Sequence, residues 1–596
     1  MVHFIKREGI VNYIKTHHID LSIYFLSALL TILLHYPALE SDWLFDDLQI
    51  LKHAVEYHPW EYFFVPQIWQ ELSVSNLTPW VTLSFDMDLS LFGSEPRFFY
   101  VHHLFSLWLS LVMLYTVLRM WVPRSYAFCG SLLFFVSAPI VLSAEFLCLR
   151  HYVEGSVLIL LSLFLFIIAL RRKNFHLSYL SAISYFFSMT AKEIYVPFVL
   201  VILFLPEGKW SSRVKYTTPH FIALLFYIVW RSWMLGRVIG GYQSELLNKN
   251  IFPEVYRIAV TNTSESIKML AGVSSIGNFV HFILLALTIV LLMIAILIYV
   301  RKRRFSEIIF ISIVIISVYA PISPSFIFFS VNTFDSYRFL LLFSLVYASL
   351  TVVIAHRLSP SGAQLGVSFR IIQRGAILSI VAVITALIFF SSYQWITAHR
   401  ELTIKPLVAE YRFLMNADTK SVMVKTSALP LTTYYEIMDY FRMLYKKQHI
   451  PNVVYGIFFD IRDNPISNPQ GLQVYKYSST EKGMVEITKD FFAKRKDYLS
   501  RVRKMPFHIR LTVKDGKFDF LLGPSDKGRY FLLAGYRSGV YNTFLALPRT
   551  LQNKAFPGKI RWYVRFGWES PEGWVTLSPE WFIDFSKDKK IQWEQG

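Results

Sequence analysis

Two adjacent carboxylates, Asp46 and Asp47, follow an apolar run of the chain in the stretch DWLFDDLQIL at residues 42–51. A carboxylate beside a hydroxyl group can take its proton as the oxygen attacks a carbon, so the pair favours general-base catalysis. Two acids this close also disfavour joint ionisation, and a partly desolvated pocket therefore raises the pKa of one of them. The alternative interpretation is a solvated loop after a helix.

The composition identifies a membrane as the setting of this acid pair. The chain has 596 residues, of which 54% are hydrophobic and 17% charged, and its mean hydropathy is +0.41. The formal net charge of +19 comes from short basic clusters at the ends of apolar runs, without the continuous basic face of a nucleic-acid-binding protein. Only two cysteines occur, Cys129 and Cys148, so neither a disulfide framework nor a cysteine metal site is indicated.

Eleven apolar segments are predicted to cross the membrane as helices. Their ranges are 21–38, 99–119, 126–146, 153–170, 176–190, 194–206, 218–236, 279–300, 306–322, 339–355 and 375–392. A cytoplasmic N-terminus puts every basic cluster on the cytoplasmic side, including RKRR at 301–304, as the positive-inside rule requires. The rule also predicts a break at Ala191–Glu193, because one long helix over 176–206 would move RKRR to the outside.

This topology leaves Lys192 and Glu193 at the outer side of the membrane, the side on which the acid pair falls. A charge pair that interrupts a hydrophobic stretch points to a function. Two longer segments also face outward. The first, 39–98, contains the aromatic stretch HPWEYFFVPQIWQEL and is predicted to carry a helix at the membrane interface; the second is 237–278.

The composition changes after the predicted membrane domain, residues 1–393. Residues 394–596 predict an extracytoplasmic α+β or β-sandwich domain. LTTYYEIMDYFRMLYKKQ is typical of a helix, while FHIRLTV, KFDFLLG, YFLLAGY and IRWYVRFGW alternate as strands do. The aromatic residues of GWESPEGWVTLSPEWF would suit sugar stacking, although packing in a β-sheet core explains them equally well.

An ordered series of motifs resembles a known enzyme family. The series is LTPWVTLSFDMDLSLFGSEPRFFYVHHLFSLWLSLVMLYTVLRMW, then LFFVSAPIVLSAEFLCLRHYVEGSVLILLSLFLF, then MTAKEIYVPFVLVILF. Over roughly residues 20–350 the chain resembles the TMTC-type (transmembrane and tetratricopeptide-repeat) mannosyltransferases. More broadly it resembles the GT-C membrane glycosyltransferases, which include the protein O-mannosyltransferases and the lipid A aminoarabinose transferases. The tetratricopeptide repeats of the first family are absent from this chain.

The resemblance implies a polyprenyl-phosphate sugar donor, an active site at the outer membrane face and a catalytic base in the first outer loop. FDD supplies that acid as Asp46 or Asp47, and Asp46 is preferred because it aligns with the leading acid of the family's pair. His102 and His103, in YVHHLFS, match a family histidine that would hydrogen-bond donor or acceptor, or would be structural.

Three cations match family positions near the leaving group, where positive charge would stabilise a developing phosphate. They are Lys192 in AKE, Arg338 in FDSYRF and, less securely, Arg150 after AEFLCL. Glu193 would keep Lys192 charged and oriented. No metal is expected, since Asp86 and Asp88 of FDMD would diverge on a helix and the resemblance implies no ligand there. No cofactor is expected either.

These features predict a polytopic α-helical, GT-C-like membrane protein with a C-terminal soluble domain. Its expected activity is inverting transfer of a sugar from a polyprenyl-phosphate donor to a hydroxyl of a secreted or surface protein or a glycan. The expected location is a bacterial inner membrane, with a cytoplasmic N-terminus and a periplasmic or extracellular C-terminal domain. One alternative is transfer to a lipid or a cell-envelope polysaccharide. Another is a non-enzymatic polysaccharide assembly or transport protein.

Overall fold

The computed structural model describes residues 7–238, 266–272, 277–301, 305–322, 334–358, 367–417, 421–424, 452–454, 471–514, 517–535, 538, 543–555, 561–584 and 587–595. The chain forms two compact units, Met1–Arg400 and Glu401–Gly596. Most of the predicted outer segment 237–278, residues 302–304 of the basic cluster and the helix predicted at 431–448 lie outside the described residues.

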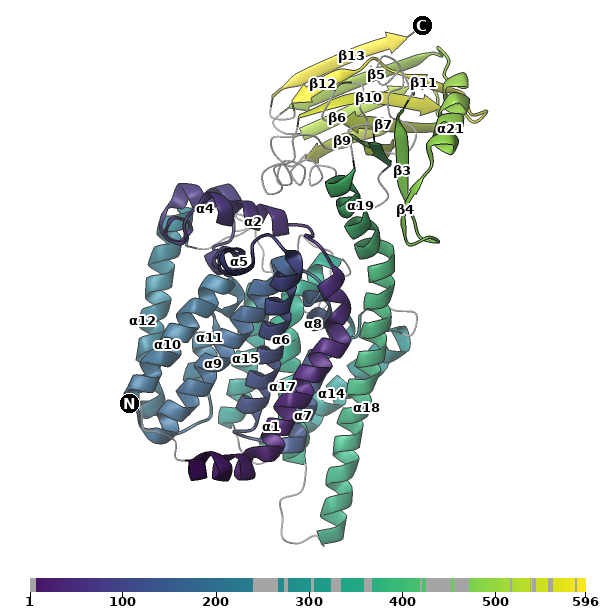
Figure 1. Ribbon diagram of the computed structural model, residues 1–596. Helices are drawn as coiled ribbons and strands as arrows, with labels where there is room; N and C mark the ends of the chain where they lie inside the picture. Colours follow the sequence, from purple (N-terminus) through teal and green to yellow (C-terminus); the bar gives the residue numbers. More distant parts are fainter. Residues whose placement is uncertain are drawn as a thin grey trace. The chain divides into compact units, whose positions relative to one another are not determined.

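The first unit consists of helices, the longest of which run side by side (Figure 1). In chain order they are α1 (Arg7–His35), η1 (Tyr36–Glu40), α2 (Asp47–Glu56), α3 (Pro59–Phe64), α4 (Pro66–Leu72), α5 (Pro79–Phe92), α6 (Pro96–Leu118), α7 (Arg124–Phe135), α8 (Ala138–Ser143), η2 (Leu147–Leu149), α9 (Arg150–Arg172), α10 (Phe175–Ala191), η3 (Glu193–Tyr195), α11 (Phe198–Phe204), α12 (Trp210–Leu235), α14 (Gly277–Arg301), α15 (Phe305–Ile322), η5 (Phe334–Leu340), α17 (Leu341–Leu358) and α18 (Val367–His399).

Helices lie over all the segments predicted to span the membrane. Within the described residues, five segments are long and apolar enough to cross a bilayer: His18–Glu40, Pro96–Leu118, Leu147–Arg172, Tyr337–Leu358 and Ile372–Asn416. The chain is therefore a multi-pass membrane protein. Small hydroxyl side chains let neighbouring helices approach, as where Ser110 Oγ lies 2.6 Å from Ser156 Oγ between α6 and α9.

Two predicted helices are broken in the structure. The interfacial helix expected in HPWEYFFVPQIWQEL is two short helices, α3 and α4, because Pro66 has no amide hydrogen with which to continue α3 and instead begins α4. The segment 126–146 likewise divides into α7 and α8, with Pro139 in the first turn of α8. The predicted break after Ala191 is confirmed, since Lys192 has an extended backbone between α10 and η3.

The second unit is rich in β-structure and begins with the π-helical turn Arg400–Ile404, from Glu401 on, and α19 (Lys405–Asn416). A small sheet has the order β2-β1-β3-β4, in which β1 (Ser421–Val424) is parallel to β2 (Asn452–Val454) and to β3 (Gln473–Ser478), while β4 (Gly483–Glu486) is antiparallel. Phe491 of the helix α21 (Thr488–Ser500) packs against this sheet in a small apolar cluster.

Two antiparallel sheets follow and share one apolar core. The first has the order β11-β10-β7-β8, with β12 also paired to β10, and the second has the order β13-β5-β6-β9. Their strands are β5 (Phe507–Lys514), β6 (Lys517–Gly523), β7 (Arg529–Gly535), β8 (Thr543–Leu547), β9 (Thr550–Ala555), β10 (Arg561–Glu569), β11 (Val575–Leu577), β12 (Trp581–Asp584) and β13 (Lys589–Gln595). Alternate residues of β5 are buried together with residues of β7 and β10, so the predicted β-rich module is confirmed.

Candidate active site

The acid pair lies on a tight turn between η1 and α2. Residues 41–44 have no regular structure, and Phe45 has a left-handed backbone with φ of 50°. This conformation is costly for a bulky side chain and persists only where surrounding contacts maintain it. The ring of Phe146 provides one such contact, at 5.0 Å between centroids in an edge-on arrangement. The turn therefore presents Asp46 and Asp47 in a defined conformation.

The two acids have different surroundings. Asp47 is fully buried, and its Oδ2 accepts a hydrogen bond of 2.7 Å from the Leu44 amide. Burial, reinforced by the charge of Asp46, raises the pKa of Asp47 to about 8, against the opposing effect of the Leu44 amide. Asp46 is exposed to solvent at the N-terminal end of α2. The raised pKa that adjacent acids predict is thus found at Asp47.

The segment 148–152, at the start of α9, links the predicted cations to the acid pair. Cys148 interacts electrostatically with Asp46, Asp47 and Arg338. Three positions further on, His151 interacts with Lys192 and with Arg338. Because such interactions weaken with distance, these charges gather around one short segment although they are up to 292 positions apart in the chain.

Lys192 and Arg338 approach this segment from opposite parts of the sequence. Lys192 lies between α10 and η3, and its Nζ is 4.8 Å from the centroid of the Tyr152 ring. Arg338, on η5, also interacts with Tyr152 and lies over the neighbouring Phe339 ring at 5.0 Å. The face of an aromatic ring carries partial negative charge, which favours the Lys192 ammonium over Tyr152 and the Arg338 guanidinium over Phe339.

Glu193 contacts residues other than Lys192. Its carboxylate forms an ion pair with Arg231 of α12, and its Oε1 accepts a hydrogen bond of 2.7 Å from the Leu77 amide. Lys192 and Glu193 point to different neighbours because the chain is extended at Lys192, so consecutive side chains diverge. Glu193 therefore connects α12 with the segment between α4 and α5.

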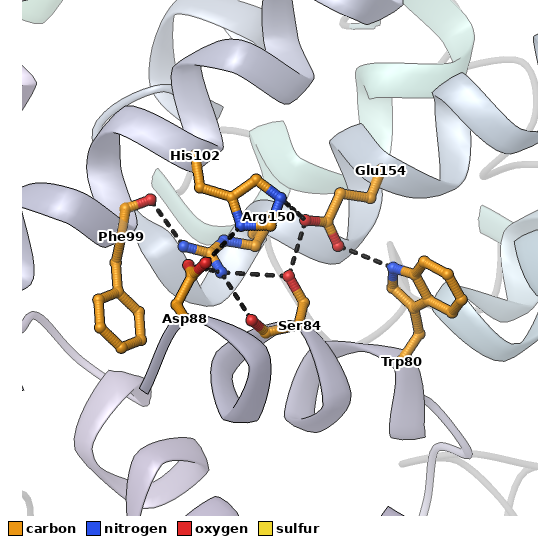
Figure 2. A network of polar contacts seen from close by, with 7 residues as sticks. All are labelled: Trp80, Ser84, Asp88, Phe99, His102, Arg150 and Glu154. Atoms are coloured by element: carbon orange, nitrogen blue, oxygen red, sulfur yellow. Dashed lines mark hydrogen bonds and ion pairs between the residues drawn. The ribbon is translucent and has the colours of Figure 1, made fainter. Parts of the chain in front are cut away.

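Arg150 was predicted to bind phosphate, but the structure gives it other partners (Figure 2). Its side chain is fully buried. Nη1 donates to Asp88 Oδ2 at 2.6 Å and to Ser84 Oγ at 3.1 Å, and Nη2 donates to the Phe99 carbonyl at 2.7 Å. A guanidinium with these contacts connects α5, α6 and α9, and its role in phosphate binding stays a prediction.

The two histidines have separate surroundings. His102 belongs to the same polar network as Arg150: its Nδ1 lies 2.7 Å from Asp88 Oδ1, and its Nε2 lies 3.6 Å from Glu154 Oε1 (Figure 2). His103 is buried, and its Nε2 donates to the Ser143 carbonyl at 2.6 Å. The structural interpretation thus fits His103. His102 is the more accessible, with 29% of its side chain exposed.

Asp86 and Asp88 diverge, as their spacing predicted. Asp86 lies 3.4 Å from the Tyr62 hydroxyl, whereas Asp88 belongs to the Arg150 network. Within the part of the chain that the structure describes, no group of three or more histidine, cysteine, aspartate or glutamate side chains is arranged to hold a metal ion.

Two further acids of the unit, Glu145 and Glu154, were not predicted to make functional contacts. Glu154 accepts hydrogen bonds of 2.8 Å from Trp80 Nε1 and from Ser84 Oγ (Figure 2). Glu145 forms a buried ion pair with Arg400. The signal was available in the sequence, because an acid inside an apolar segment needs a partner. The identity of that partner was not.

No protein-family model matches the chain, and no curated protein sequence matches it. Among solved structures, the chain is similar to the crystal structure of ArnT from Cupriavidus metallidurans bound to undecaprenyl phosphate, with 12% identity, a TM-score of 0.39 and coverage of 76% of this chain and 93% of that one. It is also similar to the archaeal oligosaccharyltransferase AglB from Archaeoglobus fulgidus, in complex with an inhibitory peptide and a dolichol-phosphate. That match has 9% identity, a TM-score of 0.41 and coverage of 91% and 77%. Similarity at this level assigns no activity.

Proposed function

We propose that this protein is a GT-C-type membrane glycosyltransferase that moves a sugar from a polyprenyl phosphate to a hydroxyl acceptor. The observation that carries the proposal is the gathering of two acids, Asp46 and Asp47, and two cations, Lys192 and Arg338, around the segment 148–152. The order of the sequence motifs supports the same activity. The site would open to the outer membrane face.

Asp46 is the catalytic base in this proposal. The hydroxyl oxygen of the acceptor attacks the anomeric carbon, the bond from that carbon to the phosphate oxygen breaks, and the polyprenyl phosphate leaves with the bonding electron pair. The hydroxyl proton passes to the Asp46 carboxylate. A single displacement inverts the anomeric configuration. Asp46 suits the role because it is exposed, whereas the raised pKa of about 8 keeps Asp47 mostly protonated at neutral pH.

Lys192 and Arg338 bind the phosphate of the donor. The phosphate gains negative charge as the glycosidic bond breaks, and fixed cations stabilise that charge most strongly where water is excluded. The guanidinium of Arg338 can hold two phosphate oxygens at once, while the ammonium of Lys192 acts as a point charge. The acceptor in this proposal is a hydroxyl of a protein exposed outside the cytoplasm.

The test is transfer by the purified full-length protein in proteoliposomes. The donors are undecaprenyl phosphates that carry radiolabelled hexoses, and the acceptors are offered separately as a Ser/Thr peptide pool and as cell-envelope lipids and polysaccharides. We expect label on the peptides, release of undecaprenyl phosphate, and a loss of about 10²–10⁴-fold in turnover in Asp46→Asn. Asp86→Asn is the matched control, an acid of the same outer segment that should retain turnover.

Label on lipid or polysaccharide alone would assign a different acceptor class to the same chemistry. Wild-type turnover in both Asp46→Asn and Asp47→Asn would overturn the proposal. Thermal unfolding of each variant separates loss of chemistry from loss of the fold.

A further inference from the structure

A buried ion pair joins the end of the last helix of the first unit to the loop before α9. The guanidinium of Arg400 contacts both carboxylate oxygens of Glu145, with Nε at 2.9 Å from Oε2 and Nη2 on Oε1. Both side chains are buried. The two residues are 255 positions apart, so the contact fixes tertiary structure rather than local structure. It lies within the first unit, of which Arg400 is the final residue.

The residues beside this pair contact the turn that carries the acids. Phe146, next to Glu145, packs on Phe45 with 5.0 Å between ring centroids and on His399 with 6.4 Å. Phe45 immediately precedes Asp46. Phe146 therefore lies between Phe45 and His399. Phe45 belongs to the turn of residues 41–47 that carries the two acids, here called the acid turn, and His399 precedes Arg400.

Hydrogen bonds of Tyr100 make a second connection between the segment at Glu145 and the turn that carries the acids. The buried hydroxyl of Tyr100 points at the carbonyl oxygens of Asp42, at 3.3 Å, and of Glu145, at 3.1 Å. The backbone at Glu145 is thus connected to the acid turn at its first residues through Tyr100 and at Phe45 through Phe146. Two independent contacts from one short segment restrain a turn more than either alone.

We propose that Glu145 and Arg400 are positioning residues that hold this turn, and with it the catalytic base, in its reactive place. The inference rests on the proposed function only for its catalytic consequence. Arg400 fixes the Glu145–Phe146 segment, this segment fixes Phe45 and Asp42, and these fix the direction of Asp46. A displacement of about 1 Å at a reacting group can cost about 100-fold in rate, so the pair controls turnover without touching substrate.

Two variants test the role of the pair. Glu145→Gln removes the charge and leaves Arg400 buried without its counter-charge, which is destabilising. Arg400→Lys keeps the charge but loses the two-pronged contact, so this milder variant retains the fold. Arg124→Gln is the matched control: Arg124 also holds an acid through two contacts, both of 3.1 Å to Asp20. Asp20 lies 15 residues before the C-terminal end of α1, or roughly 22 Å along the helix.

The first readout is hydrogen exchange of the peptide that contains Ser41–Leu48 in the full-length protein. We expect faster exchange of this peptide in Arg400→Lys and Glu145→Gln, and wild-type exchange in Arg124→Gln. The second readout is transfer from undecaprenyl-phosphate hexose. We expect kcat to fall about 10- to 100-fold with the KM for the donor unchanged within about twofold, because the phosphate-binding cations lie outside the turn.

Wild-type exchange of Ser41–Leu48 in both variants overturns the inference, whatever their activity. Equal loss of kcat in Arg124→Gln also overturns it, since any weakened ion pair would then have the same effect. The proposed function fails separately, by wild-type turnover of Asp46→Asn and Asp47→Asn. In that case the hydrogen exchange of the peptide Ser41–Leu48 still decides whether Glu145 and Arg400 hold the turn in place.

Discussion

Asp46 and Asp47 are neighbours in the chain, yet Asp46 is exposed and Asp47 is completely buried, with one oxygen bonded to the Leu44 amide. The left-handed residue Phe45 directs the chain so that α2 begins with one acid outside the protein and the other inside it. Burial raises the pKa of Asp47, so the contributions of the two acids to activity and to stability can be separated.

Asp47 should make the protein less stable as the pH rises. Burial raises the pKa of Asp47 from an ordinary value of 3.8 to about 8, so between these values the folded state holds a proton that the unfolded state has lost. Raising the pH through this window removes stability, at about 1.4 kcal/mol for each unit by which the pKa is displaced. Asp47→Asn keeps an oxygen for the Leu44 amide and removes the titration.

Thermal unfolding of wild type and Asp47→Asn between pH 5 and pH 9 measures this effect. The melting temperature of the variant should fall less across the range, and its gain over wild type should increase up to about pH 8 and stay constant above it. Asp46→Asn removes a charge that reinforces the raised pKa of Asp47, so its pH dependence should lie between those of the other two proteins and closer to wild type, because burial is the larger cause. Parallel curves for all three proteins would mean that Asp47 titrates normally.

Arg338 should contribute directly to donor affinity. Replacement by Gln removes a charge-assisted contact to the phosphate, which is worth about 1.5–3 kcal/mol, or a loss of roughly 10- to 100-fold in the affinity for undecaprenyl phosphate. Arg338→Lys should retain part of it. Arg171→Gln is the control, since Arg171 lies on α9 21 residues after Arg150, or roughly 30 Å away. Titration of fluorescent undecaprenyl phosphate in detergent micelles gives the affinities. If Arg171→Gln weakened the affinity equally, the loss would reflect only the net charge of the protein.

Arg150 should affect stability rather than donor binding. Arg150→Gln leaves Asp88 buried without its counter-charge, and breaking a buried ion pair in this way costs about 3–5 kcal/mol. The double variant Asp88→Asn/Arg150→Gln should lose less than the sum of the single losses, because neither charge then remains. Denaturation of the four proteins measures the coupling. If the folded fraction of Arg150→Gln bound undecaprenyl phosphate as weakly as Arg338→Gln does, Arg150 would be assigned to phosphate binding after all.

Features with a local physical cause were predictable from the sequence. FHIRLTV alternates between buried and more exposed residues in β5, as period-two patterning predicts. The helix break at Lys192 followed from charge placement. The division of α3 from α4 also had a local cause, Pro66, which the aromatic pattern obscured.

Partners distant in the chain were not predictable in the same way. Arg150 sits at a helix end, where a phosphate ligand and a structural arginine look alike, and Asp88 lies 62 positions away. Glu193 pairs with Arg231 rather than with the adjacent Lys192 because the backbone between them is extended. Such pairings are set by tertiary packing, on which the periodicity and spacing of one sequence carry no information.

Phe45 provides the most direct test of whether the acid turn is held in a costly conformation. Glycine adopts a φ of +50° without the steric conflict that an L side chain meets, whereas alanine retains that conflict. Both Phe45→Gly and Phe45→Ala remove the packing on Phe146, so their difference isolates the backbone. We expect Phe45→Gly to unfold at a free energy higher by about 1 kcal/mol than Phe45→Ala and to retain more turnover. An alanine variant as stable and active as the glycine variant would contradict this, because the turn would then have relaxed to φ < 0 and would not require the left-handed conformation to present Asp46.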